Sequence, residues 1–310
     1  MAFPAFGVVP PVTLADWQFC YQNLVMGANT PFGMLKIEGL SQATIRQGDQ
    51  SFPRDHGQFI GLDLYDGRDV TVDFWVVSDG TSLQSSQLAL AAATGVSPNQ
   101  ELPLWFQLPN LPLLCVMARP RGRPLDLDTD YAAADVAKPT VTWHCTDPRI
   151  YTVSDMFTIV AEDYYNGLGP YPVGPFPVTF PYGLPSGEVE LTNTGNTEMR
   201  PQLILTAPAS SESPVIAIAN ASISSTPTLT FSLTDFVAPA QLFVDLATPH
   251  RVLLYPDGIA AGTNTPSMLS LQSGSVWWDM LPGVNKIAFS STLETVATTV
   301  TVLWAGAYEL

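Results

Sequence analysis

Apolar and polar residues alternate along much of the chain. In the stretch 68–77, one face carries the apolar residues Val70, Val72, Phe74 and Val76. Successive side chains of a β-strand point to opposite faces, so this pattern is typical of a strand with one buried face. The same alternation predicts strands at 140–146, 188–192, 228–233, 241–246 and 299–304. Because these segments leave little room for helices, the sequence predicts a mainly β protein.

One segment has a helical pattern instead. Residues 82–93 (SLQSSQLALAAA) are rich in helix formers, and their leucines and alanines recur at helical spacing. Residues 79–82 supply a turn and an N-cap before this segment, and Gly95 and Pro98 supply a stop after it. We therefore expect a single helix near 82–93.

A stretch rich in proline and glycine separates two groups of predicted strands. Between residues 164 and 187 there are six prolines and five glycines. Such a stretch cannot sustain a long ladder of backbone hydrogen bonds. We place the domain boundary just before it, within 147–152. The expected organisation is two β domains, residues 1–150 and residues 151–310.

The chain is strongly acidic. Its 310 residues include 12 Lys and Arg against 28 Asp and Glu, which gives a formal net charge of −16. Phosphate binding depends on clustered basic side chains, so specific nucleic-acid binding is not expected. With 46% apolar and 13% charged residues, the chain has the composition of packed domains. No apolar run approaches the length of a transmembrane helix, and no membrane association is expected.

The motifs of common catalytic and ligand sites are missing. The three histidines are far apart in the sequence, and the chain has neither a G-x-S-x-G nucleophile motif nor a P-loop lysine. The three cysteines form no C-x-x-C pair. The acidic run at 126–130 has the spacing of a calcium loop but lacks the glycine and the terminal glutamate of that loop. We therefore expect no metal, no cofactor and no enzymatic activity.

Two features are candidates for contacts between subunits. Arg119, Arg121 and Arg123 form the basic cluster of the sequence. In so acidic a chain we expect them to meet carboxylates of a neighbouring subunit, although a solvated turn explains them equally well. Trp75 lies on the face of its predicted strand opposite the apolar one. A strand with apolar residues on both faces needs cover on both sides, and a neighbouring subunit can provide it.

Aromatic residues of the second domain are candidates for saccharide binding. Trp277 and Trp278, together with Tyr164, could provide stacking platforms for sugars. Aromatic residues of β domains more often pack in a core, and neighbouring residues of one strand face opposite sides of the sheet. Both interpretations stay open from the sequence.

Short blocks occur in a fixed order along nearly the whole chain. They are 32–40 (FGMLKIEGL), 53–61 (PRDHGQFIG), 68–77 (RDVTVDFWVV), 146–151 (TDPRIY), 193–196 (NTGN) and 277–289 (WWDMLPGVNKIAF). In this order they resemble the distal tail proteins of siphophages, the bacteriophages with long, non-contractile tails. The resemblance implies an N-terminal β-sandwich or split-barrel-like domain with one helix, followed by a C-terminal galectin-like β-sandwich.

The resemblance also implies a function. Proteins of this family are structural virion proteins of the distal end of the tail, assembled in the host cytoplasm. Their N-terminal domains close into a six-membered ring that joins the tail tube to the tail-tip hub or adsorption apparatus. The expected partners are therefore further copies of the chain itself, the tail tube protein, the hub or tail-associated protein, and the tape measure protein.

An acidic wall suits a channel through which DNA passes, because acidic side chains and DNA phosphates are both negative and do not bind each other. On this ground we expect acids of the first domain to line the lumen of the ring, with Asp63, Asp66, Asp69 and Asp73 as candidates.

Two alternative functions belong to other classes. The first is an adhesin that binds host cell-wall polysaccharide through the second domain. The second is a cell-wall hydrolase, which needs two convergent carboxylates in a cleft. Glu188 and Glu190 are two residues apart on a predicted strand and share a face, as expected also for a solvated face.

Overall fold

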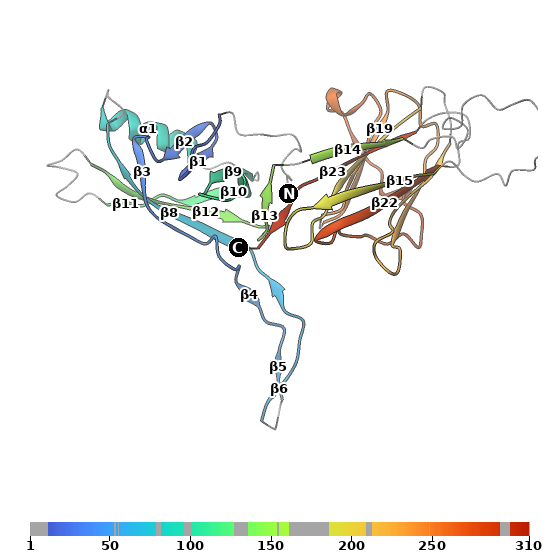
Figure 1. Cartoon of the computed structure of the whole chain (residues 1–310), viewed down its shortest axis with the longest axis horizontal. Coiled ribbons are helices and arrows are strands. Elements are labelled where there is room, and N and C mark those ends of the chain that lie inside the picture. The colour runs from blue at the N-terminus through green and yellow to red at the C-terminus, as the bar shows by residue number, and fades with distance from the viewer. Residues whose placement is uncertain are drawn as a thin grey trace, which may run out of the picture. The chain divides into compact units, whose positions relative to one another are not determined.

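The computed structural model describes residues 12–309, except 53, 55, 79–81, 96–100, 127–135, 154, 161–185, 209–212, 248 and 292–297. Contacts within the chain divide it into two compact units (Figure 1). Unit 1 comprises residues up to Val153 together with 307–310, and unit 2 comprises residues 154–306. The described chain is mainly β, as the alternation predicts. The proline-rich stretch, including Tyr164, lies outside the described residues.

The strands of unit 1 form two connected layers. Their bounds are β1 (Gln18–Tyr21), β2 (Leu24–Gly27), β3 (Phe32–Glu38), β8 (Arg68–Val76), β9 (Leu102–Gln107), β10 (Leu114–Gly122), β11 (Leu125–Asp126), β12 (Lys138–Cys145), β13 (Ile150–Thr152) and β24 (Ala307–Tyr308). The strand order is β2-β1-β9-β10-β12-β8-β3, with antiparallel pairing between all neighbours. Residues 114–118 of β10 pair with β9, and its remaining residues pair with β12. This strand therefore passes from one layer to the other.

The core of unit 1 lies between these layers. The apolar face of β8 is fully buried, as its alternation predicts. Phe74 of β8 meets Phe19 of β1 and Trp143 of β12 in edge-on ring contacts with centroids 6.1 and 6.4 Å apart. Tyr21 packs edge-on against Trp143 at 6.0 Å. These aromatic contacts tie three strands from both layers into one core.

The predicted helix is confirmed as α1 (Leu83–Ala93). Ser82 is its N-cap, and the Ser82 side chain accepts a hydrogen bond from the backbone N–H of Ser85 at 3.1 Å. Leu90 and Ala93 are buried against unit 1. The helix therefore follows the end of β8 and packs on the sandwich through one face only.

Unit 2 is a β-sandwich of two sheets. Its strands are β14 (Asp155–Val160), β15 (Ser186–Asn193), β16 (Gln202–Thr206), β17 (Val215–Asn220), β18 (Thr228–Ser232), β19 (Gln241–Asp245), β20 (Arg251–Tyr255), β21 (Thr265–Pro266), β22 (Gly283–Ser291) and β23 (Thr299–Trp304). One sheet has the order β14-β23-β16-β19-β20-β21 and the other β15-β22-β17-β18. Two short 3₁₀ helices, η1 (Ile259–Ala261) and η2 (Met268–Ser270), lie in its loops.

The two sheets of unit 2 enclose an apolar core. The residues facing inward have no exposed surface: Leu203, Leu205, Ile216, Ile218, Leu229, Phe231, Leu242, Val244, Ile287, Phe289, Val300 and Val302. They alternate along their strands, which confirms the period-2 pattern of the sequence.

Buried asparagines hold the turn that precedes β22. The Asn285 side chain donates to the carbonyls of Leu281 and Gly283 at 2.7 and 3.0 Å and accepts from the Leu281 N–H at 2.9 Å. Asn220 donates to the Asn285 side-chain oxygen at 3.1 Å, and Asn193 donates to the Met280 carbonyl at 3.3 Å. Because these amides replace water as partners of buried backbone groups, they fix the loop without a metal or a disulfide.

Candidate functional site: assembly surfaces

One face of the layer β3–β8–β12 is polar and exposed. Neighbouring strands pair their side chains across this face. Thr71 and Thr142 share a hydrogen bond at 3.2 Å, and Thr140 donates to the Asp73 carboxylate at 2.6 Å. Nδ1 of His144 lies 2.6 Å from the Asp69 carboxylate. The face is therefore a ladder of hydrogen-bonded side chains.

This face carries charges of both signs. On β3, the Lys36 ammonium contacts the Glu38 carboxylate at 2.5 Å, and this hydrogen bond raises the pKa of Lys36. Arg119 of β10 lies opposite His144, so it extends the same face. Of the four candidate lumen acids, the structure places Asp69 and Asp73 on this face, each with a partner. It places Asp63 and Asp66 elsewhere, on the segment that joins β3 to β8.

Trp75 stands at one end of the polar face. Its indole lies over Gly33, the residue opposite it on β3, and a side chain at Gly33 would collide with the indole ring. The Trp75 side chain nevertheless remains 39% exposed. The glycine thus allows Trp75 to lie flat on the sheet and present the other side of its ring outward.

The segment between β3 and β8 projects from unit 1 as a long hairpin (Figure 1). We call its residues 44–66 the arm. Short strands β4 (Ile45–Arg46) and β7 (Leu64–Tyr65) pair near its root, and β5 (Gln50–Ser51) and β6 (Gln58–Phe59) pair near its tip. Such two-residue ladders are too short to be stable by themselves.

Apolar side chains of the arm face solvent. The described residues of the arm are exposed, except Phe52 and Gly61, which are half-buried. The exposed large apolar residues are Ile45, Phe59, Ile60, Leu62, Leu64 and Tyr65. Ile60 is 97% exposed and Leu62 is 74% exposed. An exposed apolar surface of this kind marks a site of protein–protein contact.

The arm has a defined backbone shape. The chains of Gly48 and Gly61 cross so closely that a Cβ on Gly61 would lie 1.9 Å from the Gly48 carbonyl oxygen. The Gly61 N–H donates to the Asp49 carboxylate at 2.8 Å, which holds the crossing in place. Nearer the tip, the rings of Phe52 and Phe59 pack edge-on with centroids 4.4 Å apart. Only glycine fits such a backbone approach.

The root of the arm is clamped by Arg68. This side chain is 4% exposed and donates to the carbonyls of Gly39 and Leu40 at 3.2 and 3.0 Å. Burial lowers the pKa of Arg68, whose charge is compensated by these carbonyl dipoles and by carboxylates nearby. Gly39 has φ +87°, and a Cβ there would overlap the Asp69 carbonyl. The arm therefore leaves the sandwich in a fixed direction.

Helix α1 presents an uncharged surface. Its sequence LQSSQLALAAA contains no ionisable residue, and Leu88, Ala89 and Ala92 of its outer face are exposed. Leu88 is 61% exposed. Exposed helix faces usually carry charged residues. This apolar ridge is therefore a second candidate contact surface.

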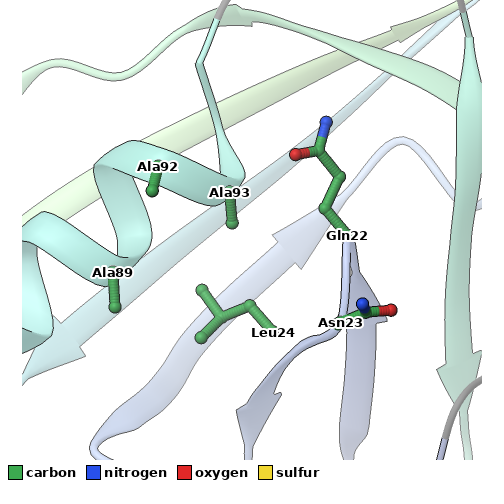
Figure 2. Close-up of a pocket in the computed structure, with 6 residues that line it drawn as sticks. All are labelled: Gln22, Asn23, Leu24, Ala89, Ala92 and Ala93. Carbon is green, nitrogen blue, oxygen red and sulfur yellow. The ribbon is translucent and has the colours of Figure 1, made fainter.

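A groove runs along each side of the ridge. The first, of about 320 Å³, lies between α1 and the turn from β1 to β2, with Leu24 beside Ala89 and Ala93 (Figure 2). The second, of about 300 Å³, lies between α1 and β11, and we call it the helix groove. Leu88, Leu90, Leu125 and Pro139 give it apolar walls, and Arg123 is the one charged residue of its lining.

The structure separates the members of the arginine cluster. Arg119 is half-buried, and Arg121 and Arg123 are exposed beyond it. Arg123 borders the helix groove. The turn thus brings a positive charge to an apolar groove, a combination that the sequence pattern did not predict.

Packing covers most of the aromatic surface that was a candidate for saccharide binding in unit 2. Trp278 is 3% exposed and belongs to the core. Trp277 is half-buried, and the His250 imidazole stacks on its indole with ring centroids 4.1 Å apart. Tyr164 lies outside the described residues. Of the three candidates, Trp277 remains at the described surface, with one of its ring faces covered.

The two glutamates considered for hydrolysis form ion pairs on an open strand. Glu188 and Glu190 flank Lys286 of the neighbouring strand, each at 3.5 Å. Their charges raise the pKa of Lys286, Glu188 having the larger effect. Both carboxylates are more than half exposed. This is the arrangement of a solvated sheet face.

Neither a metal cluster nor a reactive thiol occurs in the described chain. No three His, Cys, Asp or Glu residues of its described part could hold a metal ion together. Cys20, Cys115 and Cys145 are free and buried. Burial raises the pKa of Cys115 and of Cys145 to about 12, which keeps these thiols protonated. Within the described residues, no helix has the length and apolarity needed to cross a membrane.

Sequence reasoning missed the arm and the helix ridge as contact surfaces. The signal was present in two places. The run 60–66 (IGLDLYD) combines large apolar residues with two aspartates, and the run 83–93 lacks any charge. Both features become meaningful only when the fold shows that they face outward.

The fold of the chain is similar to that of solved bacteriophage proteins. The solved structures similar to the chain include the Dit protein of phage SPP1, a paradigm of the hub adsorption apparatus in phages that infect Gram-positive bacteria. The TM-score is 0.57 at 16% identity, over 94% of this chain and 98% of that chain.

A chain of the phage P2 baseplate in its activated conformation has the same fold. With Ca or with Sr bound to that baseplate, the TM-score is 0.51 at 9% identity, over 92% of this chain and 97% of that chain. No protein-family model and no curated protein sequence matches the chain. At these identities the likeness shows a shared fold, and it extends over both units.

Proposed function

We propose that this protein is a structural component of a phage tail tip, in which unit 1 assembles copies of the chain into a ring that joins the tail tube to the adsorption apparatus. The observation that carries this proposal is the likeness to Dit, which spans nearly the full length of both chains. A fold alone does not define a function. The assembly surfaces of unit 1 supply the independent physical argument.

Unit 1 has surfaces that a partner must cover. The arm exposes six large apolar side chains, and Leu88 and Trp75 add two more. A protein that exposed these surfaces permanently would aggregate. Closed cyclic symmetry covers such surfaces and also removes unpaired sheet edges. A hexamer is the ring that the family resemblance implies.

The polar face of β3–β8–β12 is the surface that we assign to the lumen. Its hydroxyls and paired charges, with Asp69 and Asp73 among them, offer DNA no cluster of free cations. DNA could then slide past without binding. A hexamer structure with this face turned outward, or with a strongly basic bore, would contradict the assignment.

Mass photometry and electron microscopy of the purified protein, alone and with the tail tube protein of its phage, test the proposal. We expect rings of six copies, capped on one side when the tube protein is added. A protein that stays monomeric under both conditions contradicts the proposal.

The proposed role is structural. An adhesin function of unit 2 stays an alternative, and it now depends on Trp277. A glycan array comparing the protein with Trp277→Ala tests it, because a platform that binds sugar loses its signal when the indole is removed. An array without binding to either protein removes this alternative.

A further inference from the structure

The contact that closes the ring can be assigned to particular residues. Resting on the proposed function, we propose that the arm of one copy docks in the helix groove of the next copy. Ile60 and Leu62 of the arm pack on Leu88 and Leu125, and Asp63 pairs with Arg123. The occupant of the groove is thus a second copy of this chain.

Ring symmetry requires two complementary surfaces on each chain. A ring built from identical subunits uses a heterologous contact, in which two different surfaces of one chain complement each other. Unit 1 offers two such surfaces: the projecting arm, with Ile60 and Leu62 exposed, and the concave helix groove of about 300 Å³. The arm is convex and the groove concave, and both carry large apolar side chains.

The charges of the arm and of the helix groove are complementary. The segment 60–66 of the arm contains Asp63 and Asp66 and no basic residue. The helix groove has Arg123 as the one charged residue of its lining, and Arg121 is exposed nearby. Opposite charges at the rim of an apolar contact fix its register and disfavour the reversed pairing.

The arm cannot reach the groove of its own chain. The arm joins the start of β8 and α1 follows the end of this nine-residue strand, which places them about 30 Å apart at 3.3 Å per residue. The arm also points away from the sandwich, with α1 on the far side (Figure 1). The Arg68 clamp holds that direction. Docking therefore joins two copies.

Two single substitutions test the arm and the helix groove independently. Leu62→Asp damages the arm and leaves the groove intact, whereas Leu88→Asp damages the groove and leaves the arm intact. Each variant alone should associate at least about tenfold more weakly than the unchanged protein, because a charge replaces an apolar anchor. Val276→Asp, at a residue 53% exposed in unit 2, is the matched control and should associate normally.

Mixing the two variants gives the decisive result. The intact arm of the Leu88→Asp chain can enter the intact groove of the Leu62→Asp chain, but that pair cannot grow further. Analytical ultracentrifugation should therefore show dimers in the mixture and monomers in each variant alone. Full-sized rings from Leu62→Asp, or a mixture that stays monomeric, overturn the inference. Matching thermal unfolding of all variants shows that the folds are intact.

Cross-linking answers the question even if the ring closes only on the tail. In a mixture of Asp63→Cys and Arg123→Cys chains, a bis-maleimide should link one chain of each kind, since the native cysteines are buried. Asp63→Cys alone should give no product, and a product from it would show arm-to-arm pairing instead. The absence of mixed products at high protein concentration overturns the inference.

The two proposals fail in different ways. Rings that persist in Leu62→Asp leave the tail-tip ring standing and refute the arm contact. An unchanged protein that forms no ring with the tail tube protein, yet gives the mixed cross-link, refutes the ring and keeps the contact.

Discussion

Unit 1 and unit 2 are both layered β structures with fully buried cores, yet their surfaces differ. Of the seventeen large apolar side chains exposed in the described chain, thirteen belong to unit 1. Six of these lie on the arm alone. Scattered exposed apolar residues are ordinary, whereas a concentration on one projecting element indicates a contact surface.

Several buried polar groups of unit 2 have partners within the unit. Asp245 is 1% exposed and receives hydrogen bonds from Arg251 at 2.7 Å and from the backbone N–H of Ala247 at 3.1 Å. The buried asparagines around the turn at 281–283 are similarly paired. On the proposed function, further copies of the chain cover the exposed apolar side chains of unit 1, whereas unit 2 has few such side chains to cover.

The largest expected effects come from substitutions in the two cores. Trp143→Ala in unit 1 and Phe289→Ala in unit 2 should each lower the free energy of unfolding by about 3–5 kcal/mol, because each leaves a cavity. Calorimetry should show that each lowers the unfolding transition of its own unit. Only Trp143→Ala should also reduce ring formation. Equal loss of rings in both variants would contradict the division of roles.

Removing the buried amide of Asn285 should lower the stability by a smaller amount, and only in unit 2. Asn285→Ala removes the partners of the Leu281 N–H and of two carbonyls. Leaving such groups unsatisfied costs about 1–3 kcal/mol. Chemical denaturation should show this loss, while mass photometry shows unchanged assembly. A variant that loses its rings would link unit 2 to the assembly after all.

The Arg68 clamp tests the direction of the arm. Arg68→Met removes the donors to the Gly39 and Leu40 carbonyls, and we expect a loss of stability of about 1 kcal/mol. Limited trypsin digestion of the dissociated protein should cut faster at Arg46 and Arg54 in the arm. Arg200→Met, which breaks an ion pair with Asp279 in unit 2, is the control. Identical cleavage of both variants would show that Arg68 does not hold the arm.

The smallest expected effect is a pH-dependent change in folding stability that comes from the buried cysteines of unit 1. Cys115 and Cys145 have their pKa raised by burial from 9.0 to about 12. Above pH 9 the unfolded chain releases thiol protons that the folded chain retains, so stability should fall as the pH rises beyond 9 and be unaffected below it. A thiol reagent at pH 8 should label the unfolded protein and leave the folded one unlabelled. Rapid labelling of the folded protein would contradict the burial.

Much of the fold could be predicted from the sequence, because its strands have one buried face. The alternation in 68–77 and 299–304 predicted β8 and β23 within a residue. The helix was predictable because residues 83–93 are rich in helix formers and Ser82 provides an N-cap directly before them. Local pattern and global packing point the same way in these elements, so short-range reasoning was sufficient.

The contact surfaces could not be predicted in the same way. Ile60 and Leu62 resemble core residues in the sequence, and only the fold shows that they belong to an arm without a core. The sequence also gives no sign that Arg68 donates hydrogen bonds to the Gly39 and Leu40 carbonyls at the root of the arm. Asp63 and Asp69 were both candidates for the lumen wall, but Asp63 lies on the arm and Asp69 on β8. Such placements depend on long-range geometry.

Hydroxyl-radical footprinting of the unchanged protein, assembled and dissociated, compares the two units most directly. On assembly, Ile60, Leu62 and Leu88 of unit 1 should lose most of their reactivity. Met268 and Val276 of unit 2, also exposed in the single chain, should keep theirs. Protection that falls on unit 2 while the arm stays as reactive as before would show that the exposed apolar surface of unit 1 is not what brings the copies together.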